Sequence, residues 1–164
     1  MTAIKIAVVM GSISDWSQMK HCCDLLEELD IPYQKQILSA HRMPDEMFAF
    51  AKEAHGNGIR IIIAGAGGAA HLPGMIASQT TLPVIGVPMK SRALSGMDSL
   101  LSIVQMPAGI PVATMAIGES GAKNAALMAV RMLAAENKQL TEKLARYQVA
   151  QKQKAIESEA AWYE

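Results

Sequence analysis

The side chains best suited to chemistry in this sequence lie together in Ser39-Ala40-His41-Arg42. An imidazole has an intrinsic pKa of about 6.5, so His41 can both donate and accept a proton near neutral pH. The guanidinium of Arg42 can donate paired hydrogen bonds to a phosphate. A single loop histidine is more often an incidental surface residue. Its arginine neighbour, and the proline-started helix that follows, indicate proton transfer on a phosphorylated ligand instead.

A second segment, Gly11-Ser12-Ile13-Ser14-Asp15, is suited to binding an anion. It combines small residues, two hydroxyl groups and backbone N–H groups at the start of an expected helix. The carboxylate of Asp15 can accept hydrogen bonds from the hydroxyls of a ribose. The alternative interpretation is that Ser14 or Asp15 only caps the helix.

The third segment runs from Gly65 to Gly74 and consists mostly of glycine and alanine, which let a ligand approach the backbone closely. It contains G-x-G-x-x-A, the spacing of a dinucleotide-binding turn. That turn belongs after the first strand and needs an acidic residue about 20 positions later, and neither condition is met here. His71 in this segment is either a second proton-handling group or a helix-capping residue bonded to the backbone.

Several other chemistries lack a motif in this sequence. It has no P-loop for ATP, no G-x-S-x-G turn of an α/β-hydrolase, and no metal-ligand spacing that joins His41 or His71 to a cysteine or a carboxylate. The adjacent Cys22 and Cys23 suit neither an ordinary disulfide nor a zinc site, and we interpret them as small buried hydrophobic residues. We therefore expect a site that uses neither a metal nor a cofactor.

The three segments sit within an alternating pattern of strands and helices. Short β-branched runs predict the strands, and apolar residues at helical spacing predict the helices. The expected strands are Ile4–Met10, Tyr33–Leu38, Ile59–Ala64, Val84–Val87 and Val112–Ala116, and the expected helices are Trp16–Leu29, Pro44–Asn57, Leu72–Thr80, Asp98–Met106 and Gly121–Ala135. This pattern favours an α/β fold with a parallel sheet covered by helices on both faces. The three segments would then meet beyond the carboxyl ends of the strands.

Length and composition restrict the class of protein. The chain has 164 residues, 51% of them apolar and 18% charged, which favours one folded domain and excludes disorder for most of it. Its 15 Lys and Arg residues balance 15 Asp and Glu residues, so neither a nucleic acid nor a membrane is an expected partner. No apolar run approaches the roughly 18–20 residues of a membrane span, and no signal peptide is visible, so we expect a cytoplasmic protein.

The composition changes after Asn137 to Lys, Gln, Glu and Ala, which predicts a helix that leaves the domain. An apolar stripe on about one side of it consists of Leu133, Leu140, Leu144 and Tyr147. This helix could pack on a neighbouring subunit, while the part beyond Gln151 could equally be a solvated, fraying end. Abundant Ala, Gly and Met with few aromatic residues suggest more apolar surface than a small monomer hides, and hence an oligomer.

Three motifs resemble those of a known family. M-G-S-x-S-D-W at Met10–Trp16, S-A-H-R at Ser39–Arg42 and A-G-A-G-G-A-A-H-L-P-G-M at Ala64–Met75 are similar to the class I PurE family, the N5-carboxyaminoimidazole ribonucleotide mutases of purine biosynthesis. Further similar segments are Gly86–Pro88, Ser95–Leu100, Ser102–Pro107 and Gly121–Ala126. The resemblance covers nearly all of Ile4 to Leu133. It departs at Met43, where the family commonly has Thr, and at Ile13, where the family often has a polar residue.

The resemblance implies a flavodoxin-like three-layer α/β/α subunit with a parallel sheet. It implies a catalytic domain at 1–135 and a helical extension at 136–164 that packs on a neighbouring subunit of a homo-octamer. The substrate would be a small phosphorylated ribonucleotide, and the reaction would move a carboxylate from its exocyclic nitrogen to ring carbon four. A separate ATP-dependent carboxyaminoimidazole ribonucleotide synthetase is a possible functional partner. Neither a metal nor a cofactor is implied.

The resemblance also assigns roles to individual residues. His41 corresponds to the family's general acid/base. The implied substrate-binding residues are Ser12, Ser14, Asp15, Ser39, Ala40, Arg42, Ala66, Gly67, His71 and Leu72. Within this set, Asp15 would bind the ribose, Arg42 would lie near the phosphate with Ser14 and Ser39, and the last four would line the pocket for the migrating carboxylate.

Two other functions remain open from the sequence. One is a direct aminoimidazole ribonucleotide carboxylase, which would take free carbon dioxide on the same fold. The other is a non-catalytic, flavodoxin-like nucleotide-binding module. The uninterrupted glycine- and alanine-rich motif favours the mutase over the carboxylase, and the low aromatic content disfavours flavin stacking in the module.

Overall fold

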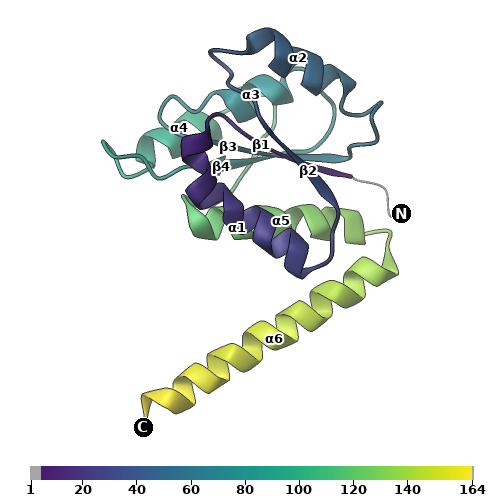
Figure 1. The fold of residues 1–164 in the computed structure, drawn as a ribbon, viewed down its shortest axis with the longest axis vertical. Coiled ribbons are helices and arrows are strands. Elements are labelled where there is room, and N and C mark those ends of the chain that lie inside the picture. The colour runs from purple at the N-terminus through teal and green to yellow at the C-terminus, as the bar shows by residue number, and fades with distance from the viewer. Residues whose placement is uncertain (1–4, 164) are drawn as a thin grey trace. The chain divides into compact units, whose positions relative to one another are not determined.

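The computed structural model describes residues 5–163, and Figure 1 shows their fold. Ile4, the first residue of the first expected strand, lies outside the described residues. The elements are, in chain order, β1 (Ile6–Met10), the short 3₁₀ helix η1 (Ile13–Asp15), α1 (Trp16–Glu28), β2 (Tyr33–Ile37), α2 (Pro44–Glu53), β3 (Ile61–Ala66), α3 (Leu72–Ala77), β4 (Val84–Pro88), α4 (Met97–Val104), β5 (Ala113–Thr114), α5 (Glu119–Ala134) and α6 (Lys138–Trp162).

The strands form one parallel sheet in the order β2-β1-β3-β4-β5. In the register of this sheet, Met10 at the end of β1 pairs with Ile37 of β2 and with Gly65 of β3. The carboxyl ends of the three strands therefore lie at one edge. The strand order reverses between β1 and β3, and such a reversal is where open parallel sheets bind ligands.

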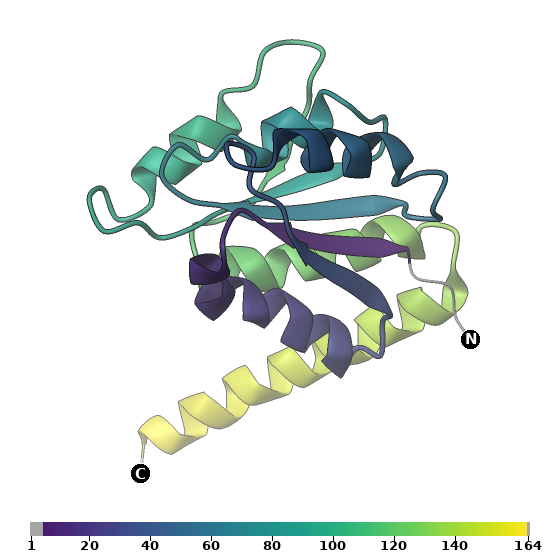
Figure 2. The same cartoon turned by 45° about the horizontal axis from the view of Figure 1, so that its top comes forward.

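Helices cover both faces of the sheet, with α2, α3 and α4 on one face and α1 and α5 on the other (Figures 1 and 2). Alternate strand residues point to opposite faces, so each face has its own apolar core. On the first face, strand residues such as Val9 and Ile62 pack with Met47 of α2 and Ile76 of α3. On the other face, the absence of a side chain at Gly65 makes room for Met19 of α1. The predicted three-layer α/β/α architecture is confirmed.

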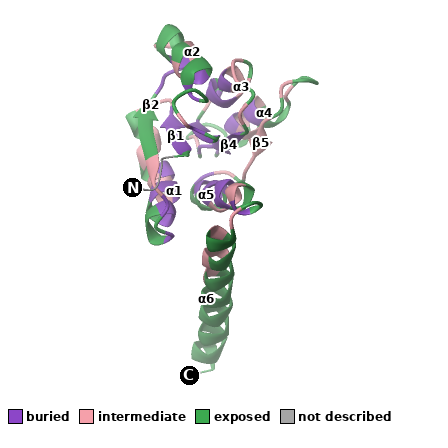
Figure 3. Cartoon of the chain, turned by 90° about the vertical axis from the view of Figure 1, so that its right-hand side faces the viewer, coloured by how far each residue is buried: buried purple, intermediate pink, exposed green. Residues whose placement is uncertain are grey.

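The edge strand β2 differs from the other long strands. Residues 34–37 of this strand are exposed, whereas β1, β3 and β4 are buried throughout (Figure 3). The general expectation of apolar strands covered on both faces is therefore wrong for β2. Its polar sequence suits a strand that has only one neighbour. The Lys35 Nζ lies 4.6 Å from the centre of the Trp16 ring, a cation–π contact that covers part of this edge.

The predicted elements are present, and their ends differ by a few residues. β3 begins at Ile61 rather than Ile59 and continues through Gly65 and Ala66, which the sequence placed in a loop. This extension depends on pairing between strands. Gly65 pairs with β1 and β4, and Ala66 pairs with β4, so both stay in the strand despite their low strand propensity. α2 ends at Glu53 instead of Asn57 because the chain turns there. Cys22 and Cys23 are buried, as predicted.

The chain divides into two compact units, one ending at Ala129 and one beginning at Val130. Leu133 belongs to α5 and not to the terminal helix, so the predicted stripe is split between two helices. The N-terminus of α6 is capped by Asn137, whose side chain accepts a hydrogen bond from the Leu140 N–H at 3.2 Å. Over the described length of α6 no residue is buried. In the described part of the chain, no helix has both the length and the apolar character to traverse a bilayer.

Candidate active site

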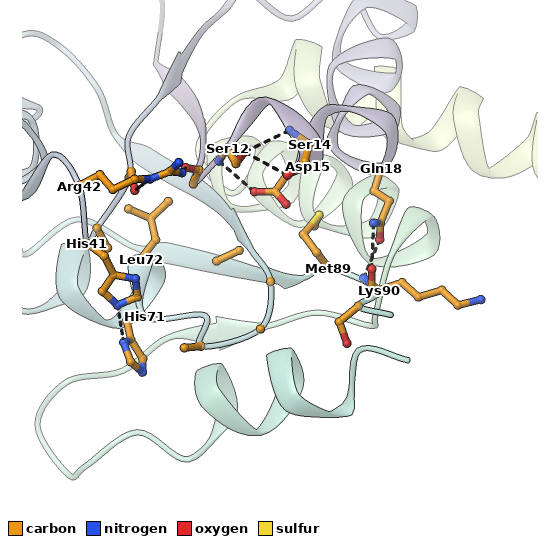
Figure 4. A pocket seen from close by; sticks show the side chains of 18 of the residues that line it. Ser12, Ser14, Asp15, Gln18, His41, Arg42, His71, Leu72, Met89 and Lys90 are labelled. Atoms are coloured by element: carbon orange, nitrogen blue, oxygen red, sulfur yellow. Dashed lines mark hydrogen bonds between the residues drawn. The ribbon is translucent and has the colours of Figure 1, made fainter. Parts of the chain in front are cut away.

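A cavity of about 630 Å³ opens at the carboxyl ends of β1, β2, β3 and β4 (Figure 4). The loops after these four strands supply its walls. All of the predicted site residues line it, namely Ser12, Ser14, Asp15, Ser39, Ala40, His41, Arg42, Ala66, Gly67, His71 and Leu72. The structure thus brings together three segments that are far apart in the chain.

The loop after β1 is ordered by its own side chains. Ser12 is the N-cap of η1, and its Oγ accepts a hydrogen bond from the Ser14 N–H at 3.3 Å. In return, the Ser12 N–H donates to Asp15 Oδ2 at 3.1 Å, which completes a capping box. Asp15 is the N-cap residue of α1, as the alternative interpretation allowed, but its side chain makes no capping hydrogen bond to α1 and takes part in the capping box of η1 instead. Capping and ligand binding are compatible here, since all three side chains also line the cavity.

Burial raises the pKa of the Asp15 carboxyl above its ordinary value. Hydrogen bonds from the backbone of Ser12 and Gly11 and the positive charge of Arg42 oppose this effect without cancelling it. The carboxylate is thus partly desolvated while these three groups still favour its charged form. Such a group can accept hydrogen bonds from a ligand at a smaller desolvation cost than a fully solvated one.

This raised pKa leads to a prediction about stability. Protonated Asp15 favours the folded state, so its contribution is present at low pH and lost as the pH rises through the folded-state pKa. Asp15→Asn keeps an acceptor for the Ser12 N–H and removes the charge. We expect the variant to gain stability relative to wild type as the pH rises from acid to neutral, by less than about 1 kcal/mol because the carboxyl is partly exposed. Denaturant unfolding at several pH values measures this, and a relative loss over the same range would contradict it.

Arg42 joins the loops after β1 and β2. Its Nε donates to Ser39 Oγ at 2.9 Å, and its Nη2 donates to the Gly11 carbonyl oxygen at 3.2 Å. A guanidinium carries five N–H donors. These two bonds orient the side chain at the cavity wall, where the rest of the guanidinium can meet an anion.

His41 and His71 form a hydrogen-bonded pair at one end of the cavity (Figure 4). His41 Nε2 lies 2.8 Å from His71 Nδ1, and the two rings are nearly perpendicular, at 85°. One nitrogen must donate and the other accept, so the hydrogen bond couples the tautomers of the two rings. His71 is the N-cap residue of α3, but its imidazole makes no capping hydrogen bond to the backbone and turns to His41 instead.

The wall beside this pair is apolar and lacks bulk. Ala66 at the end of β3 and Leu72 at the start of α3 are buried. A Cβ added at Gly67 would lie 3.1 Å from the Met89 Cβ, which is tighter than most side-chain contacts. This part of the cavity therefore fits a small, apolar group and presents few partners for water.

The loop after β4 supplies residues that sequence reasoning missed. Met89, Lys90 and Arg92 line the cavity, and so does Gln18 of α1. The Lys90 N–H donates to Gln18 Oε1 at 2.7 Å, and the Gln18 amide donates back to the Lys90 carbonyl oxygen at 3.4 Å. Figure 4 places this pair at the opposite end of the cavity from the two histidines. Ligands bind beyond the carboxyl ends of parallel strands, and this rule applies to the loop after β4 as it does to the other three loops. Nothing in the sequence indicated that Gln18 faces the loop after β4.

The described residues contain no group of three or more His, Cys, Asp or Glu side chains that could hold a metal ion. A family model described as AIR carboxylase matches residues 5–154. This chain belongs to the AIR carboxylase family. The predicted resemblance is thereby confirmed, and it extends beyond the expected limit at Leu133 into α6.

Individual members of the AIR carboxylase family are similar over nearly the full chain. A protein of Bacillus subtilis (strain 168) is 59% identical over 153 residues, which cover 93% of this chain and 94% of that protein. One from Escherichia coli (strain K12) is 54% identical over 154 residues, covering 94% and 91%, and one from Saccharolobus solfataricus is 57% identical over 143 residues, covering 87% and 89%. Each is named N5-carboxyaminoimidazole ribonucleotide mutase.

Solved structures agree with the fold of this family member. The crystal structure of Treponema denticola PurE matches with a TM-score of 0.84 at 28% identity, covering 94% of this chain and 96% of that one. The structure of a point variant of PurE2 from the same organism matches with a TM-score of 0.87 at 26% identity, covering 97% and 98%. The α/β fold is thus shared even where most residues differ.

Proposed function

We propose that this chain is a mutase that converts N5-carboxyaminoimidazole ribonucleotide into 4-carboxy-5-aminoimidazole ribonucleotide in purine biosynthesis. Relatives that are 54–59% identical over most of their length have this name. The observation that carries the proposal is that His41 lines the same cavity as Arg42, a candidate group for binding an anion, and as the apolar wall at Gly67. A group that exchanges protons there faces both the ribonucleotide and a space suited to carbon dioxide.

The proposed binding roles follow the polar half of the cavity. Arg42 holds the phosphate together with the hydroxyls of Ser14 and Ser39, and its bond to Ser39 supports a shared anion site. Asp15 accepts hydrogen bonds from the ribose. The Ser12 hydroxyl and the Ala40 backbone complete the surface against which the ribonucleotide lies.

In the proposed reaction His41 serves twice. Its imidazolium protonates the exocyclic nitrogen as the bond from that nitrogen to the carboxylate carbon breaks, which releases carbon dioxide and leaves a neutral imidazole. Carbon four of the ring then attacks the carbon dioxide, and the new carbon–carbon bond converts it to a carboxylate. The neutral imidazole removes the proton left on carbon four. Protons and electrons balance, so the net change is an isomerisation that needs no other reactant.

Carbon dioxide has to stay in place between these two steps. We assign it to the wall formed by Ala66, Gly67, His71 and Leu72. Holding it against the ring turns a bimolecular capture into an intramolecular one, and excluding water prevents side reactions. The close approach of Met89 behind Gly67 supports a tight wall.

Separate assays of the two candidate substrates test the proposal. We expect turnover of N5-carboxyaminoimidazole ribonucleotide without ATP. Turnover only with aminoimidazole ribonucleotide and bicarbonate would reject the mutase and support the direct carboxylase. Tight binding of the ribonucleotides without turnover of either would support the nucleotide-binding module.

The charge of the cavity leads to a further prediction. Among the described residues, Arg42, Lys90 and Arg92 line the cavity together with one carboxylate, Asp15, although the whole chain has no net charge. This local excess of positive charge should attract a substrate that carries a phosphate and a carboxylate. We expect the double variant Lys90→Gln/Arg92→Gln to lower kcat/KM about three- to tenfold at low salt, and expect the difference to vanish near about 0.5 M salt because exposed charges are screened.

A matched control is available for that measurement. Lys52→Gln removes an exposed cation near the end of α2, outside the cavity. It should leave the salt dependence of kcat/KM unchanged. A double variant that loses the same factor at every salt concentration would show that the two residues contact the substrate directly instead of attracting it at a distance.

We also propose a homo-octamer in which α6 packs on a neighbouring subunit. α4 and the loop before it expose large apolar side chains, namely Leu94, Met97, Leu101 and Val104, with 46–61% of each accessible. An apolar surface of this kind is typical of an interface. Light scattering should give eight times the 17.6 kDa of one chain, and Leu101→Asp should lower that mass. A monomer at micromolar concentration would contradict the proposal.

The remaining proposals concern organisation and context. We propose that 1–135 is the catalytic domain and 136–164 an extension, since every described residue that lines the cavity precedes position 93.

We propose that the enzyme is located in the cytoplasm, because phosphorylated ribonucleotides do not cross a bilayer unaided. The substrate, a carbamate, would come from an ATP-dependent carboxyaminoimidazole ribonucleotide synthetase.

A strain in which this gene is deleted should require added purines, and restoring the gene should relieve that requirement. This result would support the proposed role in purine biosynthesis.

A further inference from the structure

Two serines of α4 hold one glycine of the cavity wall. Ser99 is fully buried, and its Oγ accepts a hydrogen bond from the Gly68 N–H at 3.0 Å. The hydroxyl of Ser102 lies 3.1 Å from the Gly68 carbonyl oxygen and 2.7 Å from the carbonyl oxygen of Asp98, and it can donate to either. Residues three apart share a helix face. One face of α4 therefore engages both polar backbone groups of Gly68.

Gly68 has a backbone conformation that other residues rarely adopt. Its φ is +67°, in the left-handed region. A Cβ there would meet nothing within 4 Å, so the conformation and not the available space requires glycine. Glycine also has other backbone conformations of similar energy. The two serine hydroxyls favour the one that the structure shows.

Gly68 directly follows Gly67, which belongs to the wall assigned above to carbon dioxide. Gly67 and Gly68 both line the cavity, and a Cβ at Gly67 would lie 3.8 Å from Ser99 Oγ as well as 3.1 Å from the Met89 Cβ. The Ser99 hydroxyl thus lies directly behind the wall. A turn of the Gly68 peptide would move the wall on its cavity side.

We propose that Ser99 and Ser102 are positioning residues that keep this wall closed around the released carbon dioxide. The proposal rests on the proposed mutase function, in which carbon dioxide is free between the breaking of the nitrogen–carbon bond and the formation of the carbon–carbon bond. Carbon dioxide makes no strong directional bonds, so its retention depends on how closely the walls fit. The two serines act on the fate of this intermediate and not on proton transfer.

The experiment follows the carbon atom. Wild type, Ser99→Ala and Ser102→Ala receive N5-carboxyaminoimidazole ribonucleotide with a ¹³C carboxylate, in buffer that contains unlabelled bicarbonate. Mass spectrometry of the product measures retained label, and free aminoimidazole ribonucleotide above the enzyme-free rate measures escape. We expect wild type to retain most of the label, and each alanine variant to show an escaped fraction about three- to tenfold larger, because small displacements in a close-fitting site have large effects.

Two control variants separate positioning from general structure. Ser102→Thr keeps the hydroxyl and should restore label retention. Ser78→Ala removes a hydroxyl that donates to the Met75 carbonyl oxygen at 2.7 Å, at the end of α3, and should behave as wild type. The escaped fraction is counted per turnover, so a lower yield of folded protein does not alter it.

The outcomes distinguish this inference from the function on which it rests. Wild-type label retention in both alanine variants would overturn the positioning role, even if their kcat falls. Complete exchange of label by the wild type would overturn it too, because the wall would then hold nothing. Failure of the wild type to form product from the labelled substrate would overturn the mutase function itself.

Discussion

Replacing His41 by Asn should lower kcat by at least about 100-fold while leaving the fold and ribonucleotide binding intact. An amide neither donates nor accepts a proton at neutral pH, so both proton transfers of the proposed reaction lose their carrier. The side chain is exposed and asparagine is of similar width, so little packing is lost. The variant directly changes the hydrogen bond and the edge-to-face ring contact that His41 makes with His71.

Single-turnover kinetics and calorimetric binding of the product ribonucleotide measure the two effects separately. His55→Asn is the matched control, because His55 is exposed beyond α2 and does not belong to the cavity lining of the described structure. It should retain wild-type kcat. A His41→Asn enzyme that retains turnover would contradict the assigned role, and one that loses turnover together with binding would indicate a binding role instead.

Replacing Arg42 by Ala should weaken binding of the ribonucleotide about 10- to 200-fold, since charge-assisted hydrogen bonds contribute about 1.5–3 kcal/mol. The change removes the cation nearest to Ser39 and the two bonds that join the loops after β1 and β2. Arg42→Lys keeps the positive charge but lacks the paired, coplanar N–H donors of the guanidinium, so we expect an intermediate affinity. At saturating substrate kcat should fall much less than kcat/KM, because the guanidinium takes no part in proton transfer.

Titration calorimetry with inorganic phosphate and with the product ribonucleotide measures this loss. Arg60→Ala is the control, because Arg60 donates to the carbonyl oxygens of His55 and Ile59, at the other edge of the sheet. Thermal unfolding of both variants accounts for any loss of the loop contacts. If the affinity of Arg42→Ala equals that of wild type, the phosphate binds elsewhere in the cavity.

Local patterns were sufficient for most of the elements and for three of the four loops of the site. β-branched runs and helical spacing are local properties, and so is the proline that starts α2. The rule that parallel strands present their carboxyl ends at one edge then brings Asp15, His41 and Gly67 into one cavity. The chemistry of each side chain was readable in the same way, because hydroxyl, imidazole and guanidinium groups keep their character in any fold.

Other features depended on contacts between distant segments. Gly65 and Ala66 have low strand propensity, and β3 extends through them because Gly65 pairs with both β1 and β4 and Ala66 pairs with β4. Gln18 lies in a helical pattern that gives no sign of its two bonds to Lys90. The carboxylate of Asp15 bonds to the Ser12 N–H and not to the first turn of α1, because the loop after β1 forms a 3₁₀ turn before α1 begins.

The sequence by itself therefore determined which groups are available for chemistry, the alternation of strands and helices, and the family to which the chain belongs. Only the tertiary structure decided that His41 bonds to His71, thirty positions away, and that Ser99 and Ser102 support Gly68 from behind. The physical reason is that side-chain chemistry and helical or strand periodicity act over a few residues. A distance of about 3 Å between remote groups is set by strand order and helix packing, which depend on the whole chain at once.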